Sequence, residues 1–266
     1  ADSGALLAAD ALSEAGPPQV PDDPPEERGG GGTRNAKPYY DIPRSRILHH
    51  LIKEPPVRTS ALRTLGALPN IFALEAMIDD LANRCEKDPL DYRLALLSDE
   101  RARDVLSAVA KNAKWRERGI GGDGWGLGLA FSRYKNMAAY AATAVALRVD
   151  ERVNLEKIWV VADAGLVINP DGLRNQLEGG AIQGASWALK EQVTLDGSGV
   201  SSLDWEAYPI LCFNEVPEIE AGIIDKPHEP SLGVGECAVS PTAAAIGNAV
   251  AHALGRRISH MPLSRE

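Results

Sequence analysis

The sequence predicts an α+β fold in which mixed and antiparallel sheets pack against helices. Three apolar runs, 127–131, 139–149 and 157–165, follow one another with short connections, which is typical of an antiparallel meander rather than of strand–helix–strand units. Several Ala- and Leu-rich stretches also show the spacing of apolar residues that helices have. The 266 residues suffice for one large domain or two small ones.

The first half of the chain alternates breaks with helical patterns. Residues 13–34 are rich in Pro and Gly and predict a loop or a linker, and residues 46–52 have a strand-like composition. Further helices are expected from residue 87 and over 99–115. An amphipathic helix follows residue 70, with Ile71, Leu74, Ile78 and Leu81 on its apolar face and Glu75, Asp79 and Asp80 elsewhere.

The second half begins with a Gly-rich stretch, 119–128. It lacks the Lys-Ser/Thr pair and the helix that a phosphate-binding loop needs, so a strand is expected there instead. After the meander, Asn169 and Pro170 suit the start of a long helix rich in small residues. A strand pair, 191–195 with 218–225, and a final Ala-rich helix complete the predicted elements.

Composition excludes several classes of function. The net charge of −9 disfavours a nucleic-acid groove, and no apolar run approaches the length of a membrane span. The three cysteines and five histidines show neither CxxC nor HExxH spacing, so no metal ligated by protein side chains is expected. The chain opens without Met and without a charged leader, and we expect it to be one piece of a larger polypeptide or a split subunit.

The segment Gly233, Val234, Gly235 and Glu236 stands out because a carboxylate follows two glycines just before an apolar helix. Such a carboxylate is either a charge at a helix N-terminus or a base aimed into a pocket. Arg63 and Gln183 each have two possible roles as well. Arg63 is either a surface cation or a site residue, and Gln183 either bonds neighbouring backbone or faces a ligand.

Three segments together resemble the molybdenum hydroxylases, the family of xanthine oxidase and aldehyde oxidoreductase. Residues 163–184 resemble its D-x-G-x-x-x-N-P and Q-x-E-G-x-x-x-Q-G elements. Residues 233–236 resemble its G-x-G-E loop, and residues 61–75 its A-F-R-G-x-G segment with the following F-x-x-E. The match covers most of the chain, and the nearest branch is that of isoquinoline 1-oxidoreductase and nicotinate dehydrogenase.

The resemblance implies a chemistry. Glu236 would be the catalytic base in a hydroxylation that takes its oxygen from water, with an aldehyde or an N-heteroaromatic ring as substrate. The metal would be held by a molybdopterin cofactor, in the cytosine dinucleotide form, with no side-chain ligand. Two departures bear on the pocket, because Thr64 replaces the Gly of the family's R-G pair and Cys237 follows the glutamate. The cofactor-binding residues implied are Arg63, Thr64, Gln183, Gly233, Val234 and Gly235.

Other motifs of the family are missing, including its G-Q-G segment. The resemblance therefore implies a cofactor site shared with a second chain that carries the N-terminal molybdopterin-binding segments. Iron–sulfur clusters would lie on a separate subunit, which would pass electrons on to a cytochrome or a flavin protein. We expect an N-terminal segment and linker over 1–34 and two molybdopterin-binding portions over 35–118 and 119–266.

Two questions stay open at this level. One alternative is a non-catalytic scaffold that only completes the fold of the molybdopterin-binding protein, and the role of Glu236 separates it from an enzyme component. The compartment is the other question: bacterial cytoplasm and periplasm both remain, and exported enzymes of the branch favour the periplasm or a membrane association.

Overall fold

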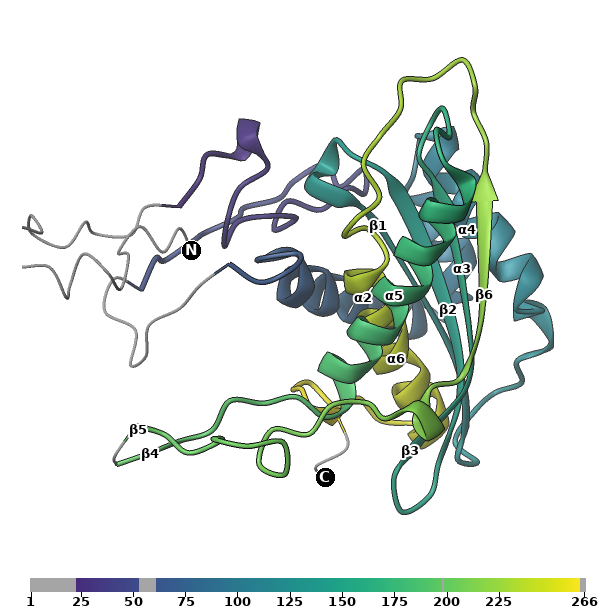
Figure 1. The fold of residues 1–266 in the computed structure, drawn as a ribbon. Helices are drawn as coiled ribbons and strands as arrows, with labels where there is room; N and C mark the ends of the chain where they lie inside the picture. The colour runs from purple at the N-terminus through teal and green to yellow at the C-terminus, as the bar shows by residue number, and fades with distance from the viewer. Residues whose placement is uncertain (1–22, 53–60, 198, 264–266) are drawn as a thin grey trace, which may run out of the picture.

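A four-stranded sheet with helices on both faces forms the body of the protein (Figure 1). The computed structural model describes residues 23–52, 61–197 and 199–263. The strands lie in the order β1-β2-β3-β6, and two short strands, β4 and β5, form a separate pair. The strands are β1 (Trp125–Arg133), β2 (Tyr140–Val149), β3 (Val153–Asp163), β4 (Leu195–Asp196), β5 (Gly199–Val200) and β6 (Glu218–Ile224).

The helices divide between the two faces of the sheet. Helices α5 and α6 cover one face, with α2 packed on α6, and α4 covers the other face (Figure 1). None of the helices in the described ranges combines the length and apolar character that crossing a lipid bilayer requires. The helices are α2 (Ala67–Arg84), α3 (Pro89–Ala95), α4 (Glu100–Asn112), α5 (Pro170–Leu189) and α6 (Val239–Leu254), with short 3₁₀ turns η1 (Glu26–Arg28), η2 (Trp115–Glu117), η3 (Tyr134–Asn136) and η4 (Phe213–Glu215).

The predicted α+β class and the meander are confirmed. β1, β2 and β3 pair antiparallel in sequence order, and β6 then pairs parallel with β3 after the crossover through α5. Both faces of the sheet are covered, which explains why β2 is a nearly continuous apolar run whose first eight residues are buried. The N-cap of α5 is also as expected, since Asn169 Oδ1 accepts from Gly172 N at 2.9 Å.

Helix α6 lies directly on β1 because β1 carries two glycines at the contact. A Cβ at Gly126 would lie 2.0 Å from Ala249 O, and one at Gly128 would lie 2.2 Å from Ala249 N. The alanines of α6 keep the helix itself slim enough for this approach. The main chain of α6 is thus placed against β1, and this fixes where the turn before α6 enters the molecule.

The described part of the Pro/Gly-rich segment is an ordered loop rather than an exposed linker. The carboxylate of Asp23 accepts hydrogen bonds from Gly32 N at 2.7 Å and Thr33 N at 3.2 Å. Residues 29–31 are buried, and Gly31 O accepts from Gly66 N at 3.0 Å. The loop therefore packs against the turn that starts α2.

Three local predictions are wrong. Residues 46–52 form no strand, and β6 pairs with β3 instead of with residues 191–195, of which only Leu195 lies in a strand. Glu75 and Asp79 of α2 are buried, although the periodicity placed them off the apolar face. Arg93 of α3 explains their burial, because its guanidinium donates to Glu75 at 2.9 Å and to Asp79 at 2.7 Å.

Candidate functional site

Glu236 lies on the turn that leads into α6, and two distant segments hold its carboxylate. Oε1 accepts a hydrogen bond from Thr64 N at 2.6 Å, and Oε2 accepts one from the hydroxyl of Tyr134 at 2.6 Å. Neither donor belongs to α6, which starts three residues after Glu236. The carboxylate is therefore fixed by tertiary contacts and does not cap the helix. Of the two roles that the sequence left open for Glu236, a cap at the N-terminus of α6 is thus not the one observed.

The turn that presents Thr64 has an unusual backbone. Thr64 has φ 77° and Leu65 has φ 49°, and a positive φ is a conformational outlier for a β-branched residue. Glycine, which the family segment has at the position of Thr64, adopts it without a steric cost. Strain of this kind is kept where the surrounding structure requires it, and functional sites are the commonest setting. Here it aims the N–H of Thr64 at Glu236.

Arg63 joins the same cluster from the other side. Its Nε donates to Gly235 O at 2.6 Å, one terminal nitrogen donates to Gln183 Oε1 at 3.0 Å, and the other donates to Gln176 Oε1 at 3.0 Å. Arg63 is thus not a free surface cation. Gln183 bonds this guanidinium rather than neighbouring backbone, so both residues meet at the turn before Glu236.

The crossing of α5 and α6 brings these groups together. A Cβ on Gly184 would lie 2.5 Å from Val239 O, so only glycine permits the observed approach. A Cβ on Gly180 would lie 3.1 Å from the Cβ of Ala238, which is a tight contact. Gln176, Gly180 and Gln183 lie on one face of α5 because residues three, four and seven apart share a face. Small residues of α5 therefore set Gln176 and Gln183 beside Arg63.

Gly233 and Gly235 are not required by close packing against the described residues. A Cβ on Gly233 would meet no atom within 4 Å, and one on Gly235 would meet only Gln176 Oε1, at 3.8 Å. Neither glycine has a positive φ. The space beside this turn is open, whereas Val234 between them packs against a small cluster with Leu177 and Cys237.

Cys237, the residue after the glutamate, is not a nucleophile in this setting. Its side chain is 1% exposed, and its thiol donates to Val234 O at 3.4 Å. Burial raises the pKa of the thiol to about 12, so Cys237 stays protonated at neutral pH. The cysteine therefore belongs to the packed interior next to the turn.

Sequence reasoning missed three residues of this cluster, Tyr134, Arg34 and Gln176. Gln176 belongs to the Q-x-E-G element and was detectable by that resemblance. Tyr134 sits on the turn between β1 and β2, and Arg34 sits in the ordered loop 23–36. No periodicity or spacing connects positions that lie a hundred residues apart, so only the fold brings these two to Glu236.

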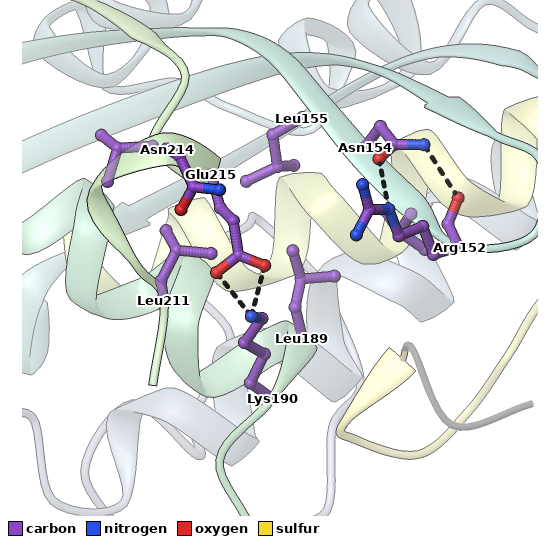
Figure 2. A pocket seen from close by; sticks show the side chains of 10 residues that line it. Arg152, Asn154, Leu155, Leu189, Lys190, Leu211, Asn214 and Glu215 are labelled. Carbon is purple, nitrogen blue, oxygen red and sulfur yellow. Dashed lines mark hydrogen bonds and ion pairs between the residues drawn. The ribbon is translucent and has the colours of Figure 1, made fainter. Parts of the chain in front are cut away.

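A separate cavity of about 220 Å³ lies at the far end of α5 (Figure 2). Apolar residues Leu155, Leu189 and Leu211 line it, and Lys190 and Glu215 form an ion pair at 2.5 Å in its wall. None of the residues around Glu236 lines it. Lys190 follows the last residue of α5 and lies seven positions after Gln183, about 10 Å along the helix axis. This cavity is therefore not part of the Glu236 cluster.

Comparison with known proteins identifies the family. Two models described as "Molybdopterin cofactor-binding domain" match residues 74–217 and residues 7–96. The chain is 39% identical over 260 residues to one of the subunits of nicotinate dehydrogenase from Pseudomonas putida, covering 92% of this chain and 22% of the relative. It is 32% identical over 227 residues to the beta subunit of isoquinoline 1-oxidoreductase from Brevundimonas diminuta, covering 84% of this chain and 29% of the relative. The chain thus spans less than a third of the length of these curated relatives.

Two solved structures share the fold of this chain. Quinoline 2-oxidoreductase from Pseudomonas putida 86 superposes with a TM-score of 0.66 and 13% identity, covering 76% of this chain and 52% of that one. Aldehyde oxidoreductase from Desulfovibrio gigas superposes with a TM-score of 0.66 and 14% identity, covering 77% of this chain and 41% of that one. The matched models span more than half of the sequence, although Glu236 lies beyond them. The chain belongs to the molybdopterin cofactor-binding family of the molybdenum hydroxylases, in the branch of nicotinate dehydrogenase and isoquinoline 1-oxidoreductase.

Proposed function

We propose that this chain supplies Glu236 as the catalytic base of a molybdenum hydroxylase, and that a second chain completes the cofactor site. The observation that carries the proposal is the carboxylate of Glu236, held on both oxygens beside an open, glycine-lined turn. A general base needs a fixed position within reach of the proton that it takes. Each carboxylate oxygen has one placed donor and keeps a lone pair that can accept that proton.

The residues around Glu236 fit a molybdopterin cofactor. The hydroxyl of Thr64 is buried and has no hydrogen-bond partner among the described residues, which suits a group supplied from outside this chain. Gly233 and Gly235 leave space where side chains would stand. Arg63, Thr64 and Gln183 would hold the cofactor through the donors that groups of this chain do not already use, which include the hydroxyl of Thr64 and the side-chain amide N–H of Gln183. When bound in its cytosine dinucleotide form, the cofactor supplies the two-electron redox chemistry.

The substrate in this proposal is an aldehyde or an N-heteroaromatic ring, with water as the source of the oxygen. Relatives named for nicotinate, isoquinoline and aldehydes support that range. Several of these relatives are named as subunits, which supports a multi-subunit enzyme. Electrons would leave through an iron–sulfur subunit and then a cytochrome or flavin subunit.

The test of catalysis is Glu236→Gln in the complex produced by its source organism. The amide keeps the shape of the side chain but cannot take a proton, so kcat should fall by roughly 10²- to 10⁴-fold. The molybdenum content should stay that of the parent complex. The matched control is Glu218→Gln, which alters a 70% exposed carboxylate paired with Lys157 on β3 and should leave kcat unchanged. Full turnover by Glu236→Gln would favour the scaffold alternative.

A second measurement concerns the assembly. Native mass spectrometry with metal analysis on the protein from its source should find this chain with a second molybdopterin-binding chain, an iron–sulfur subunit and one molybdenum. A metal-free chain without partners would remove the support for a catalytic role. Screening of aldehydes and N-heterocycles on the intact complex would then narrow the substrate class.

A further inference from the structure

The hydroxyl of Tyr134 lies between a guanidinium and the carboxylate of Glu236. Arg34 donates to this hydroxyl from one terminal nitrogen at 2.5 Å, and the hydroxyl donates to Glu236 Oε2 at 2.6 Å. Tyr134 is 4% exposed and Arg34 is 8% exposed. These three side chains form one chain of short hydrogen bonds, which starts at two buried side chains and ends at the partly exposed Glu236.

Chemistry fixes the direction of these hydrogen bonds. A guanidinium can only donate, so the oxygen of Tyr134 must accept from Arg34, and its single proton is left for Glu236. Burial raises the pKa of Tyr134, and the hydrogen bond to Glu236 and the negative charge of that carboxylate raise it further. Arg34 lowers this pKa by a smaller amount. The phenol therefore stays protonated and able to donate throughout the neutral range.

The backbone around Tyr134 and Arg34 holds both side chains in place. Arg34 is anchored by donating to Gly29 O at 2.8 Å and to Gly30 O at 2.9 Å. Its neighbour Asn35 donates to Arg133 O at 2.8 Å and accepts from Lys135 N at 2.9 Å, which ties the loop 23–36 to the turn that carries Tyr134. The orientation of the hydroxyl is thus set by the fold of two separate segments.

We propose that Tyr134, ordered by Arg34, is the positioning residue for Glu236. Its hydroxyl holds Oε2 while Thr64 N holds Oε1, and the plane of the carboxylate is thereby fixed relative to the open side of the 233–235 turn. This inference rests on the proposed function, because it assigns the device that orients the base. Tyr134 acts through Glu236 and not on the substrate.

The kinetic test is Tyr134→Phe in the assembled enzyme. Loss of the hydroxyl lets the carboxylate rotate, and kcat should fall by roughly 10- to 100-fold, since small misplacement of a catalytic group costs that much. KM should stay within about threefold, because the lost interaction serves the chemical step and not substrate binding. Arg34→Lys, which keeps the charge but loses the planar fork, should show a smaller loss of the same kind, and Arg34→Met a larger one.

The matched control is Tyr40→Phe. Tyr40 is 5% exposed and its hydroxyl donates to the buried Glu75 at 2.6 Å, so this variant removes an equally short Tyr–Glu hydrogen bond from a different carboxylate. A merely structural role predicts equal effects of the two variants on kcat. The positioning role predicts that Tyr40→Phe lowers stability while kcat stays unchanged.

A readout without turnover is the NMR signal of the tyrosine Cζ carbon in the full chain labelled with ¹³C-tyrosine. Tyr134→Phe assigns the signal of Tyr134, and Glu236→Gln and Arg34→Met should each shift it, whereas Glu218→Gln should not. An unmoved signal in Glu236→Gln would overturn the inference, because the hydrogen bond would then be absent in solution.

The outcomes separate this inference from the proposed function. Unchanged kcat in Tyr134→Phe together with an inactive Glu236→Gln enzyme would refute the positioning role and leave the catalytic role of Glu236 standing. Full turnover by Glu236→Gln would refute both. If Tyr134→Phe does not fold, the Arg34→Lys enzyme decides by the same split between kcat and KM, with an unchanged kcat counting against the inference.

Discussion

At the scale of single residues, Thr64 has a backbone conformation that is unfavourable for its own side chain but that the contact with Glu236 requires. Its φ of 77° is unfavourable for a β-branched side chain, and its buried hydroxyl has no partner among the described residues. The N–H that this conformation exposes is nevertheless one of the two donors to Glu236. The conflict is local, so it is open to a direct test by substitution.

Thr64→Gly should raise the free energy of unfolding of the chain by up to about 1 kcal/mol. The change removes left-handed strain of roughly 1–2 kcal/mol and a buried hydroxyl without a partner. Glycine's entropic cost of roughly 0.5–1 kcal/mol and a lost methyl contact of about 0.8 kcal/mol offset part of this gain. Urea denaturation followed by circular dichroism measures the difference.

The control for that experiment is Thr64→Val, which keeps the shape and the strain and removes only the hydroxyl. It should stabilise the chain less than Thr64→Gly does, or not at all. A clear loss of stability in Thr64→Gly would mean that the threonine side chain makes contacts that outweigh the strain.

At the scale of elements, α2 and α3 are joined by buried charge rather than by apolar contact alone. Arg93 is fully buried and reaches Glu75, Asp79 and the carbonyl of Pro89. Glu75 also accepts from Phe131 N at 3.0 Å, on β1. The same carboxylate therefore links two helices to the sheet, which explains why acidic residues occupy the inner face of α2.

Arg93→Met should lower the free energy of unfolding by about 3–5 kcal/mol, since removing one partner leaves buried carboxylates without their cation. The comparison is Arg116→Met. Arg116 pairs with Asp91 at 2.5 Å, but the two side chains are 61% and 53% exposed. Solvent screens such a pair, so this change should cost less than about 1 kcal/mol. Equal losses in the two variants would contradict the structural role assigned to Arg93.

At the scale of the whole molecule, the site is a meeting point of five segments. The loop before α6 carries Glu236, and the turn at Arg63 and Thr64 contacts it directly. The loop 23–36 and the β1–β2 turn reach it through Arg34 and Tyr134, and α5 holds Arg63 through two glutamines. The chain, however, spans less than a third of its curated relatives. Three nitrogens of Arg63 already donate to groups of this chain, which leaves few donors for a long anionic cofactor.

The chain expressed without partners should therefore retain less than stoichiometric molybdopterin after dialysis. Molybdenum analysis and pterin fluorescence measure the occupancy. The same chain expressed together with the remaining molybdopterin-binding segments is the control and should retain one cofactor per complex. One equivalent of cofactor held by the isolated chain would contradict a shared site.

Much of the secondary structure follows from the sequence because its causes are local. Asn169 caps α5 as expected, α3 begins at Pro89 close to the predicted start at residue 87, and the apolar runs of the meander become β1, β2 and β3. The strand predicted over residues 46–52 is wrong, and β6 pairs with β3, because strand pairing depends on partners far away in the chain. Glu75 shows the same limit, since its burial depends on Arg93 of another helix.

The sequence by itself determined the α+β class, the family resemblance and the residues of the Gly233–Glu236 loop, because short motifs and periodicities carry that information. Only the tertiary structure decided which groups surround Glu236. The donors Thr64 and Tyr134 are 172 and 102 residues away from it, and Arg34 acts through Tyr134. The physical reason is that a hydrogen bond depends on distance and direction in space. Both are set here by the close packing of α5, α6 and β1, for which the glycines at 126, 128 and 184 make room.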